Sequence, residues 1–131
     1  MTSTLKFVIY MAIFTWLLLL AASLLRVRGW TFAGTVLALG NREKMPEATP
    51  LAGRAMRTAQ NTLENFVLFA AIALVAHAAG VDGPKVATGA QVFFWARVLY
   101  VPVNYAGIVY LRTAVWLVSI VGLAMMVSAM L

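Results

Sequence analysis

The sequence predicts an all-α integral membrane protein, a bundle of four helices that cross a lipid bilayer. Of its 131 residues, 63% are hydrophobic and only 11% are charged, and the mean hydropathy is +0.92. Soluble domains are about half apolar and about a quarter charged, so a water-soluble fold of this composition would expose a large apolar surface. Four apolar runs are also long enough to cross a hydrocarbon core, which takes about 20 helical residues.

The four apolar runs follow one another along the chain, and we interpret residues 1–131 as a single transmembrane domain. We expect membrane spans over about residues 5–25, 51–79, 85–107 and 112–131. The first run could be mistaken for a signal peptide because Lys6 precedes it. It is longer than a usual signal-peptide core and is followed by Arg26 and Arg28, so we expect it to be retained. The Gly- and Pro-containing stretch 26–50 predicts a loop with a short interfacial piece around 30–39.

Basic residues cluster on one side of the predicted membrane. The first loop and its flanks carry Arg26, Arg28, Arg42, Lys44, Arg54 and Arg57, and the third connection carries Arg112. Lys6 and Lys85 lie on the other side. The positive-inside rule therefore predicts that the first and third loops are cytoplasmic and that both termini lie opposite. This orientation explains the net charge of +6, so we expect no nucleic-acid partner.

Residues that could bind a metal or act as a thiol nucleophile are scarce. The chain contains no cysteine, so any thiol chemistry requires a thiol that arrives with a substrate. His77 lies in an apolar run with no second metal ligand near it in the sequence. We expect no metal site and a structural or interfacial role for His77.

Four polar side chains interrupt the first half of the second span. Arg54, Arg57, Asn61 and Glu64 are spaced three, four and three residues apart, and this spacing places them on one face of a helix. A charge inside a membrane costs at least about 2.5 kcal/mol on insertion scales. Such residues need partners and are candidates for function.

The third span carries a second polar face. Arg97, Tyr100 and Asn104 are spaced three and four residues apart. Counted from the tight turn at residues 80–84, Arg97 and Glu64 lie at depths that agree within about one helical turn. This agreement predicts an ion pair between them. The pair could equally have only a structural role and hold the two helices together.

Arginines outnumber the acid near them. Arg54, Arg57, Arg97 and Arg112 accompany only Glu64. Since the planar guanidinium fork holds carboxylates in a bidentate manner, this excess predicts a small anion as ligand. For Arg54 and Arg112, the outermost pair, contact with lipid headgroups is the alternative.

Three segments resemble motifs of the MAPEG family, the membrane-associated proteins in eicosanoid and glutathione metabolism. Arg54-Ala-Met-Arg57-Thr-Ala-Gln-Asn61-Thr-Leu-Glu64 resembles the R-x-x-R-x-x-x-N-x-x-E signature of the second helix. Ala96-Arg97-Val-Leu-Tyr100 resembles the A-R-x-x-Y motif, and Arg112-Thr-Ala-Val-Trp116 resembles the start of the fourth helix. The loop Leu39-Gly40-Asn41-Arg42 and the run 66–80 are similar to the small bacterial branch.

The resemblance implies a homotrimer in a bacterial inner membrane, with glutathione as cosubstrate between neighbouring subunits near the cytoplasmic face. It implies that Arg112 activates the glutathione thiol. The implied binding residues are Arg54, Arg57, Asn61, Glu64, Arg97, Tyr100, Asn104, Tyr105 and either Arg26 or Arg28. The chain departs from the family pattern at Asn65, where a tyrosine is common, and at Asn104-Tyr105, where a tyrosine is shifted by one residue.

Three functions are compatible with four spans in a short chain. The first is a glutathione-dependent transferase or peroxidase that acts on hydrophobic electrophiles. The second is a non-catalytic lipid-binding or scaffold protein on the same fold, with membrane lipids or another small anion in place of glutathione. The third is a small multidrug transporter. It is disfavoured because such transporters resemble a pattern with a membrane-embedded glutamate in the first span, and the first span here has no acid.

Overall fold

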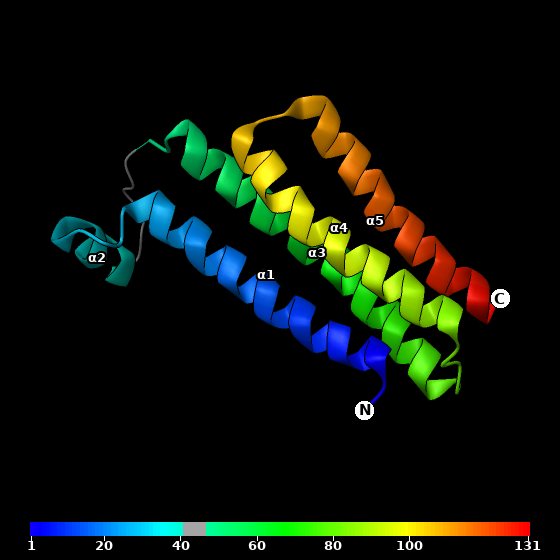
Figure 1. Cartoon of the computed structure of the whole chain (residues 1–131). Helices are drawn as coiled ribbons and strands as arrows, with labels where there is room; N and C mark the ends of the chain where they lie inside the picture. Colours follow the sequence, from blue (N-terminus) through cyan, green and yellow to red (C-terminus); the bar gives the residue numbers. More distant parts are fainter. Residues whose placement is uncertain (41–46) are drawn as a thin grey trace.

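A computed structural model of the chain describes residues 1–40 and 47–131. Within these ranges the chain forms five helices and no strand (Figure 1): α1 (Ser3–Val27), α2 (Phe32–Leu39), α3 (Pro50–Ala78), α4 (Pro84–Ala106) and α5 (Val109–Met130). Arg42 and Lys44, which contribute to the predicted charge asymmetry, and Asn41 of the predicted loop motif lie outside the described residues.

Four of the helices are long and apolar enough to cross a membrane. α1, α3, α4 and α5 each have at least 22 residues, whereas about 20 are needed. Large apolar side chains such as Trp16, Val67 and Leu117 are exposed on their outer faces. These faces suit lipid rather than water, so the prediction of an all-α integral membrane bundle is confirmed.

The long helices alternate in direction. In Figure 1 both termini and the α3–α4 turn lie at one end of the bundle, and α2 and the α4–α5 corner lie at the other. α1 packs mainly against α3, and α5 packs mainly against α4. The pair α3–α4 therefore forms the centre of the chain.

Local sequence signals set the ends of the helices. Thr2, Thr31 and Thr49 are the N-caps of α1, α2 and α3, and each side-chain oxygen accepts a hydrogen bond from an amide three residues later. Pro84 occupies the first turn of α4, where its missing N–H is not needed. Gly107 ends α4 in the left-handed conformation that glycine adopts at no steric cost.

Among the described residues, two apolar clusters lie between the helices. The smaller one packs α1 against α3, and the larger one lies toward the end of the bundle that holds the termini. Met11, Phe69, Phe93 and Met126 from the four long helices are fully buried there. The rings of Phe69 and Phe93 stack with centroids 4.5 Å apart. This packing ties α3 to α4 at one end, and the polar site described below lies at the other.

α4 and α5 approach each other closely at two glycines. A Cβ atom on Gly122 would lie 2.7 Å from the Gly89 carbonyl oxygen and 2.7 Å from the Phe93 nitrogen. Both neighbours are backbone atoms, which cannot move without shifting a helix. Small residues at this crossing therefore let the two backbones pack directly, as is common in membrane bundles.

We expect Gly122→Ala to destabilise the folded protein by about 1–3 kcal/mol, the usual cost of overpacking, even though alanine favours helix. Gly53→Ala is the matched control, because its Cβ would meet only the flexible Arg57 side chain, at 3.3 Å. Thermal unfolding in detergent should show a lower midpoint for Gly122→Ala and an unchanged or higher one for Gly53→Ala. Equal midpoints for wild type and Gly122→Ala would contradict the close crossing.

Candidate functional site

A cleft of about 310 Å³ lies between α3 and α5, with α4 contributing side chains between them. It is near the end of the bundle that holds the α4–α5 corner. Its lining residues come from three helices: Arg57, Asn61, Tyr100, Asn104, Arg112, Thr113 and Trp116. Five of these seven are residues that the sequence predicted for the site.

The spacing of these residues explains how each helix contributes to the cleft. Arg57 and Asn61 are four residues apart on α3, and Tyr100 and Asn104 are four apart on α4. Residues with this spacing lie above one another on a single helix face. On α5, Arg112 sits in the first turn and Trp116 follows one turn later, so a guanidinium and an indole lie next to each other.

A buried arginine lies between α3 and α4. Arg97 has no exposed surface, and its Nη2 donates to Asn61 Oδ1 at 2.7 Å and to Thr62 Oγ1 at 2.9 Å. Its guanidinium carbon lies 4.3 Å from the centre of the Tyr100 ring, within the range of a cation–π contact. Arg97 therefore does not line the cleft, but it contacts two residues that do.

The predicted ion pair between Arg97 and Glu64 is wrong. Glu64 is exposed, and its Oε1 accepts a hydrogen bond from Gln60 Nε2 at 3.2 Å. The buried Thr62, two residues earlier on α3, contacts Arg97 of α4 instead. The depths of Glu64 and Arg97 along their helices match, as predicted. However, the rotation of α3 about its axis turns the Glu64 carboxylate away from α4 and turns Thr62 toward it.

A second polar contact joins α3 and α4 one turn closer to the α4–α5 corner. Asn104 Nδ2 donates to Thr58 Oγ1, and Thr58 Oγ1 donates to the backbone carbonyl of Arg54 at 2.7 Å. Asn104 and Thr58 are both buried. Thr58 and Thr62 were not among the predicted site residues, although their spacing of four places them on one helix face, which was the available signal.

Arg54 stabilises the end of α4 and does not line the cleft. Its Nε donates to the backbone carbonyl of Tyr105 at 2.8 Å, one of the terminal carbonyls that have no partner within their own helix. Tyr105 offers this carbonyl and also does not line the cleft.

The arginines at the end of α1 line a separate cavity of about 260 Å³, together with Glu47 and Thr49. Arg28 is exposed and has a left-handed backbone with φ 53°. Arg26 is partly buried, and its Nη1 has no hydrogen-bond partner among the described residues. Within one chain, the predicted residues that do not line the cleft are Arg28, Arg54, Glu64, Arg97 and Tyr105.

The chemistry of the cleft favours an anion. Among the described residues, its lining includes two guanidinium groups, from Arg57 and Arg112, and no carboxylate. The amides of Asn61 and Asn104 and the hydroxyls of Tyr100 and Thr113 add hydrogen-bonding groups. Thr113 and Trp116 were missing from the predicted site, although Trp116 belongs to the segment that opens the last span.

Comparison with known proteins identifies one family. A sequence profile described as "MAPEG family" matches residues 7–131. The match includes nearly all of α1 and the whole of α3, α4 and α5. No curated protein and no solved structure matches the chain.

We expect Thr58→Val to lower the stability of the protein by about 1–3 kcal/mol, because the buried Asn104 amide loses its acceptor. Thr113→Val is the control, since the Thr113 hydroxyl is exposed and its one hydrogen bond, to the Val109 carbonyl, is long at 3.4 Å. The double variant Thr58→Val/Asn104→Leu should recover much of the loss, because no buried donor is then left unpaired. Thermal unfolding that showed no difference between Thr58→Val and Thr113→Val would contradict this role.

Proposed function

Because the chain belongs to the MAPEG family, we propose that it is a membrane-embedded glutathione-dependent transferase or peroxidase that acts on hydrophobic electrophiles. Membership relates it to membrane proteins of glutathione metabolism, among them transferases and isomerases. The observation that carries the proposal is the cleft, because it joins Arg57 and Arg112 with amide and hydroxyl groups and no acid lines it in the part of the chain that the structure describes.

Glutathione matches these groups in charge and hydrogen bonding. It has two carboxylates, and a guanidinium can hold each in a bidentate manner. We assign Arg57 to a carboxylate and Asn61, Tyr100 and Asn104 to hydrogen bonds with the peptide backbone of glutathione. Arg97 positions Asn61 through the 2.7 Å hydrogen bond to its Oδ1, and this leaves the Asn61 amide nitrogen free to turn toward the ligand.

Arg112 is the residue to which we assign activation of the thiol. A free thiol has a pKa of about 8.5 and is mostly protonated near neutral pH. A guanidinium nearby lowers the thiol pKa because it stabilises the thiolate. The thiolate then attacks an electrophilic carbon, so that a sulfur–carbon bond forms and the leaving group departs with its electron pair.

Trp116 and the outer faces of the helices provide the route for the electrophile. Trp116 lines the cleft one turn from Arg112, and the outer face of α5 presents exposed apolar side chains such as Leu117 and Val121. An apolar substrate dissolved in the bilayer could therefore reach the thiolate without crossing water.

We propose that the protein is a homotrimer, as its family resemblance implies. Glu64 is an exposed carboxylate in the middle of a membrane-spanning helix, with only Gln60 as its partner among the described residues. Facing hydrocarbon, such a charge is costly. Against a neighbouring copy it is covered, and there it would pair with the ammonium of glutathione bound between subunits.

The proposed location is a bacterial inner membrane with the cleft toward the cytoplasm. Arg26, Arg28, Arg54 and Arg57 and the cleft residue Arg112 come from the end of the bundle that holds α2 and the α4–α5 corner (Figure 1). The positive-inside rule places that end in the cytoplasm, where soluble glutathione would enter the cleft.

The proposed function is tested by titrating purified protein with glutathione. We expect Arg57→Ala to weaken binding at least about tenfold, since hydrogen bonds to charged groups are among the stronger ones. Arg112→Ala should leave affinity within a few-fold but abolish the ultraviolet absorbance of the bound thiolate. Lys85→Ala, which removes a positive charge at the opposite end of the bundle, serves as control and should match wild type.

Wild-type protein with neither glutathione affinity nor thiolate absorbance would exclude this function. In that case, phospholipid retained in the cleft, detected by native mass spectrometry and lost in Arg57→Ala, would instead favour the lipid-binding alternative on the same fold.

The assembly is tested separately by native mass spectrometry in nanodiscs, where we expect three copies of the 14.2 kDa chain. Glu64→Gln should keep the assembly and weaken glutathione binding several-fold, because it removes the charge that would meet the ammonium. Asp82→Asn, at the other end of the bundle, is the matched control. A monomer that binds glutathione with full affinity would refute an intersubunit site.

A further inference from the structure

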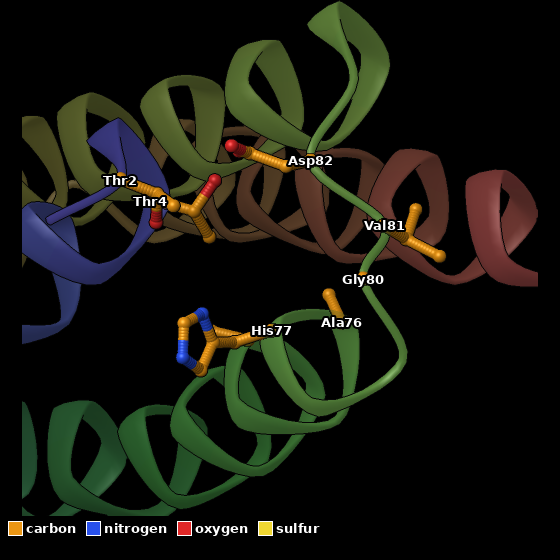
Figure 2. A pocket seen from close by; sticks show the side chains of 8 residues that line it. Thr2, Thr4, Ala76, His77, Gly80, Val81 and Asp82 are labelled. Carbon is orange, nitrogen blue, oxygen red and sulfur yellow. The ribbon is translucent and has the colours of Figure 1, made fainter.

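Another cavity lies at the end of the bundle opposite the cleft. It has a volume of about 240 Å³ and lies between the start of α1, the last turn of α3 and the turn that leads into α4 (Figure 2). Its polar lining residues are Thr2, Thr4, His77 and Asp82, and the buried Ala73 and Ala76 form an apolar wall. The glutathione proposal uses none of these residues.

One buried polar group in this cavity has no partner among the described residues. Thr4 is 4% exposed, and its Oγ1 is buried with no hydrogen-bond partner among the described residues. Native proteins rarely leave a buried hydroxyl unpaired. In Figure 2 the Thr4 and Asp82 side chains extend toward one another, and the His77 ring lies on the opposite side of the cavity from them.

The remaining polar groups are acceptors or can act as acceptors. Thr2 Oγ1 already accepts from the Leu5 amide at 3.2 Å and has a second lone pair. A carboxylate such as that of Asp82 accepts only, and an imidazole has a ring nitrogen that can accept. Among the described residues that line the cavity there is no Lys or Arg, and Asp82 contributes a carboxylate.

The shape and chemistry of the cavity select among ligands. An anion would be repelled by Asp82. A metal ion is poorly served, because no group of three His, Cys, Asp or Glu residues is found among the described parts of the chain. A primary ammonium has three N–H donors and one positive charge, which fits one carboxylate, one unpaired hydroxyl and one imidazole.

We propose that this cavity binds a primary ammonium group. The ammonium pairs with the Asp82 carboxylate, donates to Thr4 Oγ1 and donates to a ring nitrogen of His77. At this membrane surface the group has two possible sources, the ethanolamine headgroup of a phospholipid or a small free amine. Both share the chemistry that the cavity recognises, and the experiment separates them.

The free-amine arm uses full-length protein in nanodiscs that contain no aminophospholipid, titrated with ethanolamine hydrochloride. We expect saturable binding that tetramethylammonium, which has no N–H, does not compete away. Asp82→Asn and Thr4→Val should each weaken it, by about tenfold for the charged partner. Glu47→Gln removes an acid at the other end of the bundle and should match wild type.

The lipid arm compares nanodiscs of phosphatidylethanolamine and phosphatidylglycerol with nanodiscs of phosphatidylcholine and phosphatidylglycerol, by native mass spectrometry. Retained phosphatidylethanolamine that is lost in Asp82→Asn assigns the site to the lipid headgroup. Binding of ethanolamine without lipid retention assigns it to a free amine.

Absence of both kinds of binding in wild type overturns the proposal, as does wild-type behaviour of Asp82→Asn in both arms. Asp82 is exposed in a turn, so its replacement tests binding rather than folding. Thr4→Val is checked by its unfolding midpoint. Glutathione affinity is measured on the same samples and should be unchanged in Asp82→Asn, which keeps this site distinct from the cleft.

Discussion

Arg97 carries a guanidinium with no exposed surface in the middle of a membrane-spanning pair of helices. The oxygens of Asn61 and Thr62 accept hydrogen bonds from its Nη2, and the Tyr100 ring lies beside it. Its buried Nε and Nη1 have no hydrogen-bond partner among the described residues. Leaving a buried charge without partners is costly. A shift of α3 against α4 by one residue would remove these partners, so the contact holds the register of the central pair.

Because α3 and α4 are held in this register, their side chains form the floor and one wall of the cleft. Asn61 and Tyr100, which contact Arg97, both line it. The other wall belongs to α5, which is held by a different kind of contact, the direct packing of its backbone on α4 at Gly89 and Gly122. Hydrogen bonds therefore position the half of the site that belongs to α3 and α4. Close backbone packing positions the half that belongs to α5, which includes Arg112.

The sequence by itself determined the class of the fold and which residues share one face of each helix. Length and composition were enough for four spans, because the thickness of the hydrocarbon core sets the length of a crossing helix. Spacing of four residues was enough to group Arg57 with Asn61 and Tyr100 with Asn104, since the helical repeat is the same in every context. The excess of arginine over acid grouped Arg112 with the arginines of the other two helices, and the family resemblance added its role in activating the thiol.

Only the tertiary structure decided which faces meet. Spacing gives the relative angle of residues within one helix but not the rotation of that helix toward its neighbour. For this reason Arg97 contacts Thr62 and not Glu64, and Arg54 binds the carbonyl of Tyr105 at the end of α4. The cavity at Asp82 likewise combines the start of α1 with the end of α3, two segments that are distant in the sequence and meet only because the helices alternate in direction.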